Sequence, residues 1–184
     1  YKLGLRKMVA KKIHQKLGGK LRLIVSGAAP LDPKIIYGFQ GLGIKVLEGY
    51  GLTETAPVLT INLPEKMRPG SVGLPLGRTE IVIRNPNEKG VGEIVARGAN
   101  IMRGYYQDDA ATAEVFDGDW FLTGDLGRFD AEGFLHITGR KKSLIVNREG
   151  KNIYPEEVEL VINQSPSVLE SIALGSREEH TAEL

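Results

Sequence analysis

The sequence has no cysteine, only three histidines and one tryptophan, and no long hydrophobic run. Without cysteine there is no disulfide framework, no thiolate metal site and no cysteine nucleophile. The histidines His14, His136 and His180 have no Asp, Ser or Cys partner at a suggestive spacing, which argues against a catalytic triad or a histidine metal cluster. No signal peptide or membrane-spanning run is recognisable, so the sequence favours a cytoplasmic protein.

Acidic residues are missing from the start of the chain, where Asp32 is the first. The basic residues before it are Lys2, Arg6, Lys7, Lys11, Lys12, Lys16, Lys20 and Arg22. Leu5, Val9, Ile13 and Leu17 recur every four residues, which predicts an amphipathic helix with a basic face. Two interpretations stay open: a solvated helix face, or a peripheral contact with the inner face of a membrane.

The overall composition is that of a soluble globular protein. Hydrophobic residues make up 41% and charged residues 26% of the chain, and the formal net charge is +1. This small charge gives no reason to expect a nucleic-acid partner. The 23 glycines exceed the usual share and indicate many tight turns or a backbone that approaches a ligand closely.

The first part of the chain, residues 1–68, has an α/β pattern. A helix to about Leu17 is followed by the apolar run 21–25, which predicts a buried strand. Asp32 and Pro33 predict the cap and first position of a second helix that ends near Gly41 and Gly43. A second strand begins at residues 45–47.

The pattern then changes twice. Short strand-like runs at 80–84, 92–97 and 134–138 alternate with turn residues, which predicts an antiparallel sheet or small barrel over 69–139. Beyond residue 140 a short strand leads to Tyr154, Pro155 and two glutamates, which mark the start of a helix.

Two polar segments follow the predicted strands of the α/β part. Residues 26–30 (SGAAP) are small enough for a flat ring to lie against the backbone, although taken alone the segment favours a close-packed strand-to-helix turn. In residues 49–55 (GYGLTET), Thr53 offers a hydroxyl for a phosphate oxygen and Glu54 a carboxylate for Mg²⁺. The carboxyl end of a strand is the usual ligand crevice of an open α/β sheet. A polar turn with a helix-capping threonine is the alternative.

Two further segments carry candidate ligands. Asp125 follows an apolar run and a glycine, and its carboxylate suits two sugar hydroxyls, although Gly-Asp is also common in turns. Arg140, Lys141 and Lys142 lie where the strand-rich part ends. They could pair with phosphate or ribose at a hinge, or form a solvated basic turn.

Taken in order, these segments resemble the adenylate-forming superfamily of acyl-CoA synthetases, luciferases and peptide-synthetase adenylation domains. The matching segments are residues 26–31, 50–54, 70–75, 120–126 and 139–159. Within the superfamily, residues 68–73 and 142–146 look like bacterial long-chain fatty acid:CoA ligases. Peptide-synthetase domains usually carry Asp at the hinge position where this chain has Lys142.

The resemblance implies a fold and a domain order. The fold is α/β plus a β-barrel, the latter part of a large N-terminal domain, followed by an incomplete α+β C-terminal domain. Residues 1–68 are the α/β nucleotide-binding subdomain, 69–139 the antiparallel barrel-like subdomain, 140–142 the hinge, and 143–184 the start of the C-terminal domain.

The resemblance also implies an adenine site. Gly27, Ala28 and Ala29 line the adenine, and Tyr50, followed by Gly51, packs against it.

It further implies the phosphate, metal, ribose and hinge residues. Thr53 holds the α-phosphate and Glu54 the Mg²⁺. Asp125 binds both ribose hydroxyls with Arg140 nearby, and Lys142 is the pivot about which the small domain rotates.

The implied activity is ATP-dependent conversion of a fatty acid to acyl-AMP, with transfer to CoA. ATP and Mg²⁺ are the implied cofactors, and the fatty acid and CoA the implied substrates. An aryl, medium-chain or amino-acid adenylating enzyme and a non-catalytic nucleotide-binding module are the alternatives.

Two family elements are missing from this sequence. The Gly/Ser/Thr-rich phosphate loop is expected upstream of Tyr1 and the catalytic lysine beyond Leu184. Lys151 belongs to the acceptor-side loop and does not replace that lysine. We therefore expect the 184-residue chain by itself to be catalytically incomplete.

Overall fold

The computed structural model describes residues 2–147, 149–175 and 182–183. Contacts divide the chain into two compact units. Unit 1 comprises Tyr1–Glu80, Gly98–Arg103 and Asp130–His136, and unit 2 comprises Ile81–Arg97, Gly104–Phe129 and Ile137–Leu184. The sequence-based ranges mark changes of pattern along the chain, whereas each unit draws on several separate segments.

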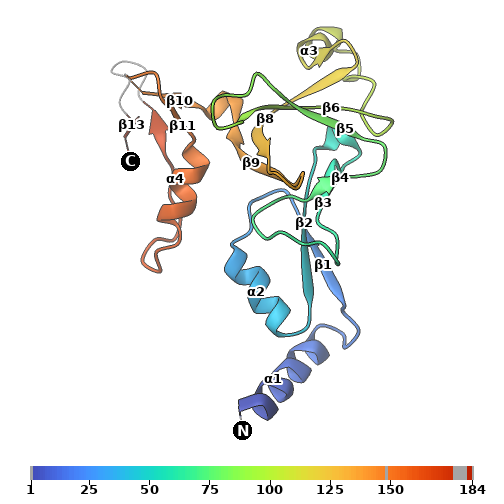
Figure 1. The fold of residues 1–184 in the computed structure, drawn as a ribbon, viewed down its shortest axis with the longest axis vertical. Coiled ribbons are helices and arrows are strands. Elements are labelled where there is room, and N and C mark those ends of the chain that lie inside the picture. Colours follow the sequence, from blue (N-terminus) through green and yellow to red (C-terminus); the bar gives the residue numbers. More distant parts are fainter. Residues whose placement is uncertain (1, 148, 176–181, 184) are drawn as a thin grey trace. The chain divides into compact units, whose positions relative to one another are not determined.

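Unit 1 has α/β architecture (Figure 1). Its elements are α1 (Lys2–Lys16), β1 (Leu23–Ser26), α2 (Pro33–Gly41), β2 (Lys45–Tyr50), the single-turn 3₁₀ helix η1 (Thr53–Thr55), β3 (Thr60–Ile61) and β4 (Leu74–Pro75). The four strands form one sheet in the order β1-β2-β3-β4. β1 and β2 are parallel, whereas β2, β3 and β4 pair antiparallel.

The second helix forms as the sequence predicts. The Asp32 side chain accepts a hydrogen bond of 2.8 Å from the backbone N–H of Lys34, and Pro33 occupies the first helical position. A cap of this kind stabilises a helix by about 1 kcal/mol. The helix ends at Gly41, which confirms the predicted stop.

The core of unit 1 lies along β2 and the strands beside it. Its buried apolar residues include Ile36, Ile44, Val46, Leu47, Leu59, Phe134 and Leu135. Each fully buried side chain of this kind contributes about 1.5–3 kcal/mol. The predicted burial of the first strand is wrong, because Leu23 is 42% and Val25 55% exposed at the sheet edge. Val9 and Leu17 of the predicted apolar helix face are likewise exposed.

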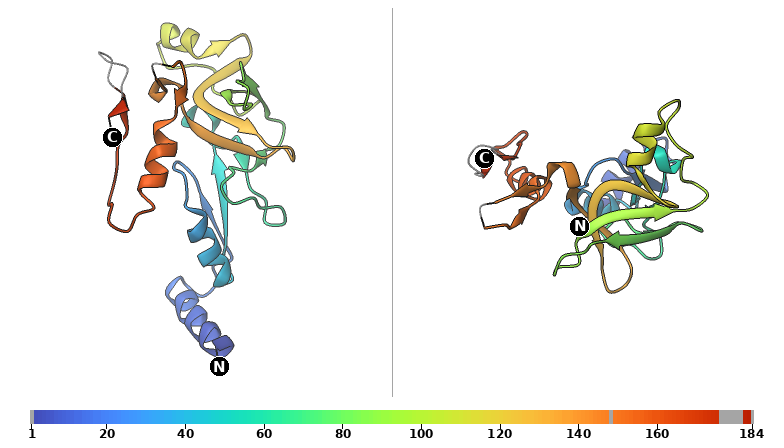
Figure 2. Two further views of the ribbon diagram at one scale, coloured as in Figure 1. Left: turned by 60° about the vertical axis from the view of Figure 1, so that its left-hand side comes forward. Right: turned by 90° about the horizontal axis from the view of Figure 1, so that it is seen from above.

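The strand-rich part contains β5 (Glu80–Arg84), β6 (Gly92–Arg97), α3 (Asp109–Glu114), β7 (Phe116–Asp117), β8 (Trp120–Phe129) and β9 (Leu135–Arg140). The strands form a five-stranded sheet in the order β5-β6-β8-β7, with β9 also paired to β8. β8 is long and strongly curved (Figure 2). The predicted sheet is confirmed in type, as a curled sheet whose β6–β8 and β7–β8 pairs are antiparallel.

The rest of unit 2 consists of short elements. They are the 3₁₀ turn η2 (Lys141–Ser143), β10 (Ile145–Val146), β11 (Asn152–Ile153), α4 (Pro155–Ile162), β12 (Leu174–Gly175) and β13 (Ala182–Glu183). Pro155 begins α4 as predicted. Val161, Leu169 and Ile172 are exposed. None of the described helices is long and apolar enough to span a membrane.

Candidate functional site

The carboxyl ends of the parallel strands β1 and β2 lie side by side. Ser26 is the register partner of Glu48, and a side chain added at Gly27 would sit 3.3 Å from the carbonyl oxygen of Gly49. The predicted adenine-lining residues 27–29 therefore follow β1 directly beside the end of β2, and all three are exposed. Ala28 has a left-handed backbone (φ 71°), which costs an L-residue about 1 kcal/mol or more.

Tyr50 ends β2, and the chain then turns tightly. The Tyr50 carbonyl accepts a hydrogen bond of 2.8 Å from Leu59 N–H. A Cβ at position 51 would lie 1.9 Å from the carbonyl oxygen of Pro57, so only glycine fits there. Gly51 thus closes the loop that carries the next three residues against the strand end.

Thr53, Glu54 and Thr55 form η1. Thr55 is fully buried, and its hydroxyl both accepts from Leu52 N–H and donates to the Leu52 carbonyl at 2.9 Å. Thr53 is exposed and Glu54 half-buried. The turn therefore anchors Thr55 and leaves a hydroxyl and a carboxylate near the end of a central strand, which suits phosphate and a hard cation.

Asp125 lies where β8 departs from regular pairing. Glu93 pairs with Leu126 and Val95 with Leu122, so β8 inserts extra residues between these two positions. The Thr123 hydroxyl donates to the Ile94 carbonyl (2.7 Å) and accepts from Asp125 N–H (3.1 Å), which fixes the bulge. Bulges of this kind redirect side chains and are common beside active sites.

The Asp125 carboxylate is 93% buried yet has a cationic partner. The Arg140 Nε atom lies 2.9 Å from Asp125 Oδ1, and side-chain exposures are 61% for Arg140 and 7% for Asp125. Beyond Arg140, Lys141 forms an ion pair of 2.7 Å with Glu93. Lys142 is exposed in η2.

The predicted residues thus fall into two groups. Unit 1 holds Gly27, Ala28, Ala29, Tyr50, Gly51, Thr53 and Glu54, gathered at two neighbouring strand ends. Unit 2 holds Asp125 and Arg140, which are in direct contact, and Lys142 two residues later. The first group offers small residues, an aromatic ring, a hydroxyl and a carboxylate. The second offers a charge-compensated carboxylate able to accept hydrogen bonds from hydroxyl groups.

A polar cluster in unit 1 gives His136 an aspartate partner that the spacing along the sequence did not suggest. Its Nε2 atom lies 3.2 Å from Asp130 Oδ2, and its Nδ1 atom 3.1 Å from the Gly70 carbonyl. Arg68 binds the same Asp130 oxygen at 2.7 Å, and its guanidinium stacks on Phe134. Asp130 precedes His136 by six residues across a hairpin, a spacing that strand pairing creates and a linear motif does not display.

Two carboxyl groups near this cluster have shifted pKa values. Burial raises the pKa of Glu48, against the opposing effects of a hydrogen bond from Gly70 N–H (3.0 Å) and the charge of His136. Burial would also raise the pKa of Asp130. Hydrogen bonds from His136 and from the N–H groups of Phe134 and Glu132, together with Arg68, outweigh burial and hold that pKa well below its ordinary value.

We expect Asp130→Asn to destabilise the chain at neutral pH and to matter less in acid. A depressed folded-state pKa means that Asp130 contributes stability above its ordinary value of 3.8, and that this contribution is lost as the pH falls below it. Urea unfolding of both proteins at about pH 7 and about pH 3 measures the effect. A stability difference that stays constant or widens in acid contradicts this prediction.

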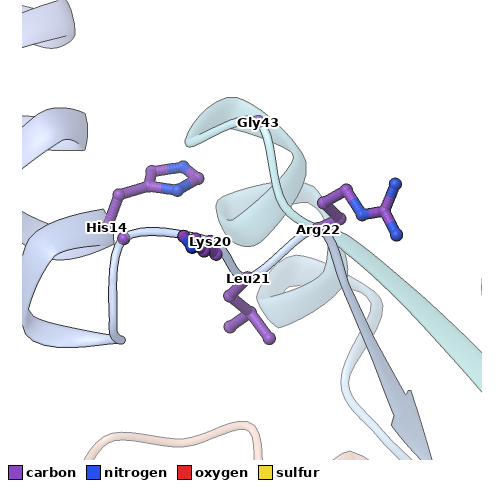
Figure 3. Close-up of a pocket in the computed structure, with 6 residues that line it drawn as sticks. His14, Lys20, Leu21, Arg22 and Gly43 are labelled. Carbon is purple, nitrogen blue, oxygen red and sulfur yellow. The ribbon is translucent and has the colours of Figure 1, made fainter.

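A shallow hollow lies elsewhere in unit 1, between the ends of α1 and α2 (Figure 3). It measures about 660 Å³ and is lined by His14, Gly19, Lys20, Leu21, Arg22 and Gly43. The His14 ring is held by the Leu42 carbonyl at 2.8 Å, whereas the Arg22 side chain points away from His14. The cations do not converge, and none of the predicted site residues lines this hollow. Among the described residues, no group of three or more His, Asp or Glu side chains is placed to hold a metal ion.

Sequence comparison matches residues 4–106 to the family of AMP-binding enzymes. The chain is 37% identical to the long-chain-fatty-acid–CoA ligase FadD15 of Mycobacterium bovis, over 92% of this chain and 27% of that protein. It is 40% identical to the oxalate–CoA ligase of Arabidopsis thaliana, over 89% of this chain and 33% of that protein. The chain thus spans about a quarter to a third of the length of these relatives.

The solved structures of o-succinylbenzoate coenzyme A synthetase (MenE) from Bacillus subtilis have a similar fold. The AMP complex aligns with a TM-score of 0.79 and 34% identity, over 88% of this chain and 35% of that one. The complex with ATP and magnesium ion aligns with a TM-score of 0.77 and 36% identity, over 84% and 34% of the two chains.

Proposed function

The chain belongs to the family of AMP-binding enzymes, and from that membership we propose that it is the AMP-recognising part of a CoA ligase that activates a carboxylic acid as an acyl adenylate. The observation that carries the proposal is the position of the candidate ligand-binding side chains at strand ends and beside a bulge. Tyr50 ends β2 beside the end of β1, and Thr53 and Glu54 follow it. The buried Asp125, on the bulge of β8, is paired with Arg140. Adenine, phosphate, Mg²⁺ and ribose are the groups that such side chains bind.

We assign the binding of the adenine base and of the α-phosphate to residues of unit 1. The backbone of residues 27–29 and the Tyr50 ring hold adenine, because a flat apolar ring needs close, small neighbours. The Thr53 hydroxyl donates to an α-phosphate oxygen, and Glu54 is a ligand for Mg²⁺. When bound, the cation neutralises negative charge that develops on the phosphate oxygens.

We assign the binding of the ribose, and the hinge, to residues of unit 2. The Asp125 carboxylate accepts hydrogen bonds from ribose hydroxyls, and the ion pair with Arg140 orients this buried carboxylate. Lys142 stands at the proposed pivot, exposed in a single 3₁₀ turn.

The substrate class that we propose is a long-chain fatty acid, with CoA as acceptor. The likeness of residues 68–73 and 142–146 to bacterial long-chain ligases supports it, as does the relation to FadD15. The relation to an oxalate–CoA ligase favours a second candidate, a ligase for a short dicarboxylate.

Calorimetric titration of the chain with AMP, GMP and ATP plus Mg²⁺ tests the proposal. We expect AMP to bind at least about tenfold more tightly than GMP, since about 1.4 kcal/mol of base-specific contacts gives this ratio. Glu54→Gln should weaken ATP binding only when Mg²⁺ is present. Equal binding of AMP and GMP, or no binding of either, would remove the basis for this function.

The same titration with non-hydrolysable acyl-adenylate analogues separates the two substrate candidates. Burial of only two methylenes of a palmitoyl chain is worth about 1.6 kcal/mol, which is more than tenfold in affinity. A palmitoyl analogue should therefore bind at least about tenfold more tightly than AMP. A gain found only with the oxalyl analogue would support the dicarboxylate candidate instead.

A further inference from the structure

The turn that carries Thr53 and Glu54 has an unfavourable backbone. Ala56, directly after η1, adopts a left-handed conformation with φ 49°. Such a conformation costs an L-residue about 1–2 kcal/mol and persists only where neighbouring contacts impose it. The bonds between Thr55 and Leu52 lie inside the turn, so further contacts are needed to hold the turn on unit 1.

Those contacts come from a distant segment, Gly98–Arg103, which belongs to unit 1 although the chain on either side of it belongs to unit 2. The Asn100 side-chain amide donates hydrogen bonds to the carbonyls of Thr55 (3.0 Å) and Val58 (3.1 Å). Two residues later, Met102 N–H donates to the Glu54 carbonyl at 2.8 Å. Two carbonyls of η1 and one of the loop that follows it thus accept hydrogen bonds from one segment.

The carboxamide of Asn100 can donate to both carbonyl groups at once. Its Oδ1 atom lies 3.1 Å from the Thr79 hydroxyl, which fixes the orientation of the carboxamide and aims Nδ2 at the two carbonyls. An amide nitrogen carries two protons and can serve both carbonyls at once. A carboxylate at this position would face two acceptors with no proton to donate, and an apolar side chain would leave both unpaired.

We propose that Asn100 is a positioning residue for the phosphate- and cation-binding turn at Thr53 and Glu54. It touches no nucleotide itself and acts by holding the carbonyls on the C-terminal side of η1. The ligands assigned to the turn, phosphate and Mg²⁺, rest on the proposed function. The role of Asn100 in holding the turn does not depend on it.

Asn62 provides a matched control in the same unit. It is only 2% exposed, its Nδ2 donates to the Ser71 carbonyl at 2.7 Å, and its Oδ1 accepts from Arg68 N–H at 2.9 Å. Asn62→Ala removes an amide that makes comparable backbone bonds, yet it touches a different loop. It should lower overall stability without loosening η1.

The experiment compares Asn100→Ala, Asn100→Asp and Asn62→Ala in the whole chain. Hydrogen exchange of the segment 50–59 should accelerate about tenfold in both Asn100 variants and remain within about twofold in Asn62→Ala, under conditions where all three are folded. Affinity for ATP with Mg²⁺ should fall about tenfold in the Asn100 variants, whereas affinity for adenosine, which lacks phosphates, should stay unchanged.

The outcomes separate the two proposals. Exchange in segment 50–59 that does not change in the Asn100 variants, or that rises equally in Asn62→Ala, overturns the positioning role. Faster exchange with unchanged ATP affinity supports the positioning role and overturns the assignment of Thr53 and Glu54 to phosphate and Mg²⁺.

Discussion

Gly73→Ala is expected to destabilise the chain by about 3–5 kcal/mol, a large part of the 5–15 kcal/mol that holds a typical domain together. A Cβ at this position would lie 1.9 Å from the carbonyl carbon of Ile61 and 2.2 Å from the backbone nitrogen of Asn62. Because both neighbours are backbone atoms of β3 and the residue after it, no side-chain rotation relieves the overlap. β3 and β4 would have to separate.

The left-handed backbone of Gly73 (φ 91°) adds a second cost, which Gly77→Ala measures by itself. Gly77 also has positive φ (61°), but nothing lies within 4 Å of an added Cβ, so its replacement should cost only about 1 kcal/mol. Urea unfolding followed by circular dichroism gives both values. If the two variants differ by less than about 1 kcal/mol, the steric argument fails.

Elements with local causes were predictable from the sequence. Asp32 before Pro33 and Tyr154 before Pro155 each begin a helix where expected. A cap or a helix-starting proline acts on the backbone within four residues, so its signal is present in a short stretch of sequence. The start of the strand that ends at Tyr50 was also predicted, at residues 45–47.

Burial of the first strand was not predictable in this way. The run 21–25 has the composition of a buried strand, yet β1 lies at a sheet edge with Leu23 and Val25 exposed. A strand's own residues determine its preference for extended backbone, but burial is set by what packs on its faces. Nothing in five residues carries that information.

The contacts that shape the candidate site depend on long-range pairing. Asn100 reaches Thr55 across 45 positions, and the bulge at Asp125 exists only because β8 is out of register with β6. The pair of His136 and Asp130 arises in the same way, through a hairpin. Sequence patterns identified Asp125 by its resemblance to a family motif. The hydrogen bonds through which Thr123 supports it became visible only with the fold.

Asp125→Ala is expected to weaken AMP binding by about 100-fold or more. A hydrogen bond to a charged group is worth about 1.5–3 kcal/mol, and the proposed carboxylate accepts two of them from the ribose. About 1.4 kcal/mol corresponds to tenfold in affinity, so even the lower figure for two bonds, about 3 kcal/mol, exceeds 100-fold. Calorimetric titration of AMP into the wild type and the variant measures the ratio.

The ligand 2′,3′-dideoxy-AMP makes this test specific to the ribose. It lacks both hydroxyls, so wild type and Asp125→Ala should bind it with nearly equal affinity, and the difference between the two ligands isolates the contact. Asp117→Ala is the matched control, since Asp117 also pairs with an arginine, Arg84, at 2.5 Å, but its side chain is exposed. It should change AMP affinity less than about threefold. Equal losses for AMP and its dideoxy analogue in Asp125→Ala would mean that the carboxylate supports the fold around β8 through Arg140 and does not bind ribose.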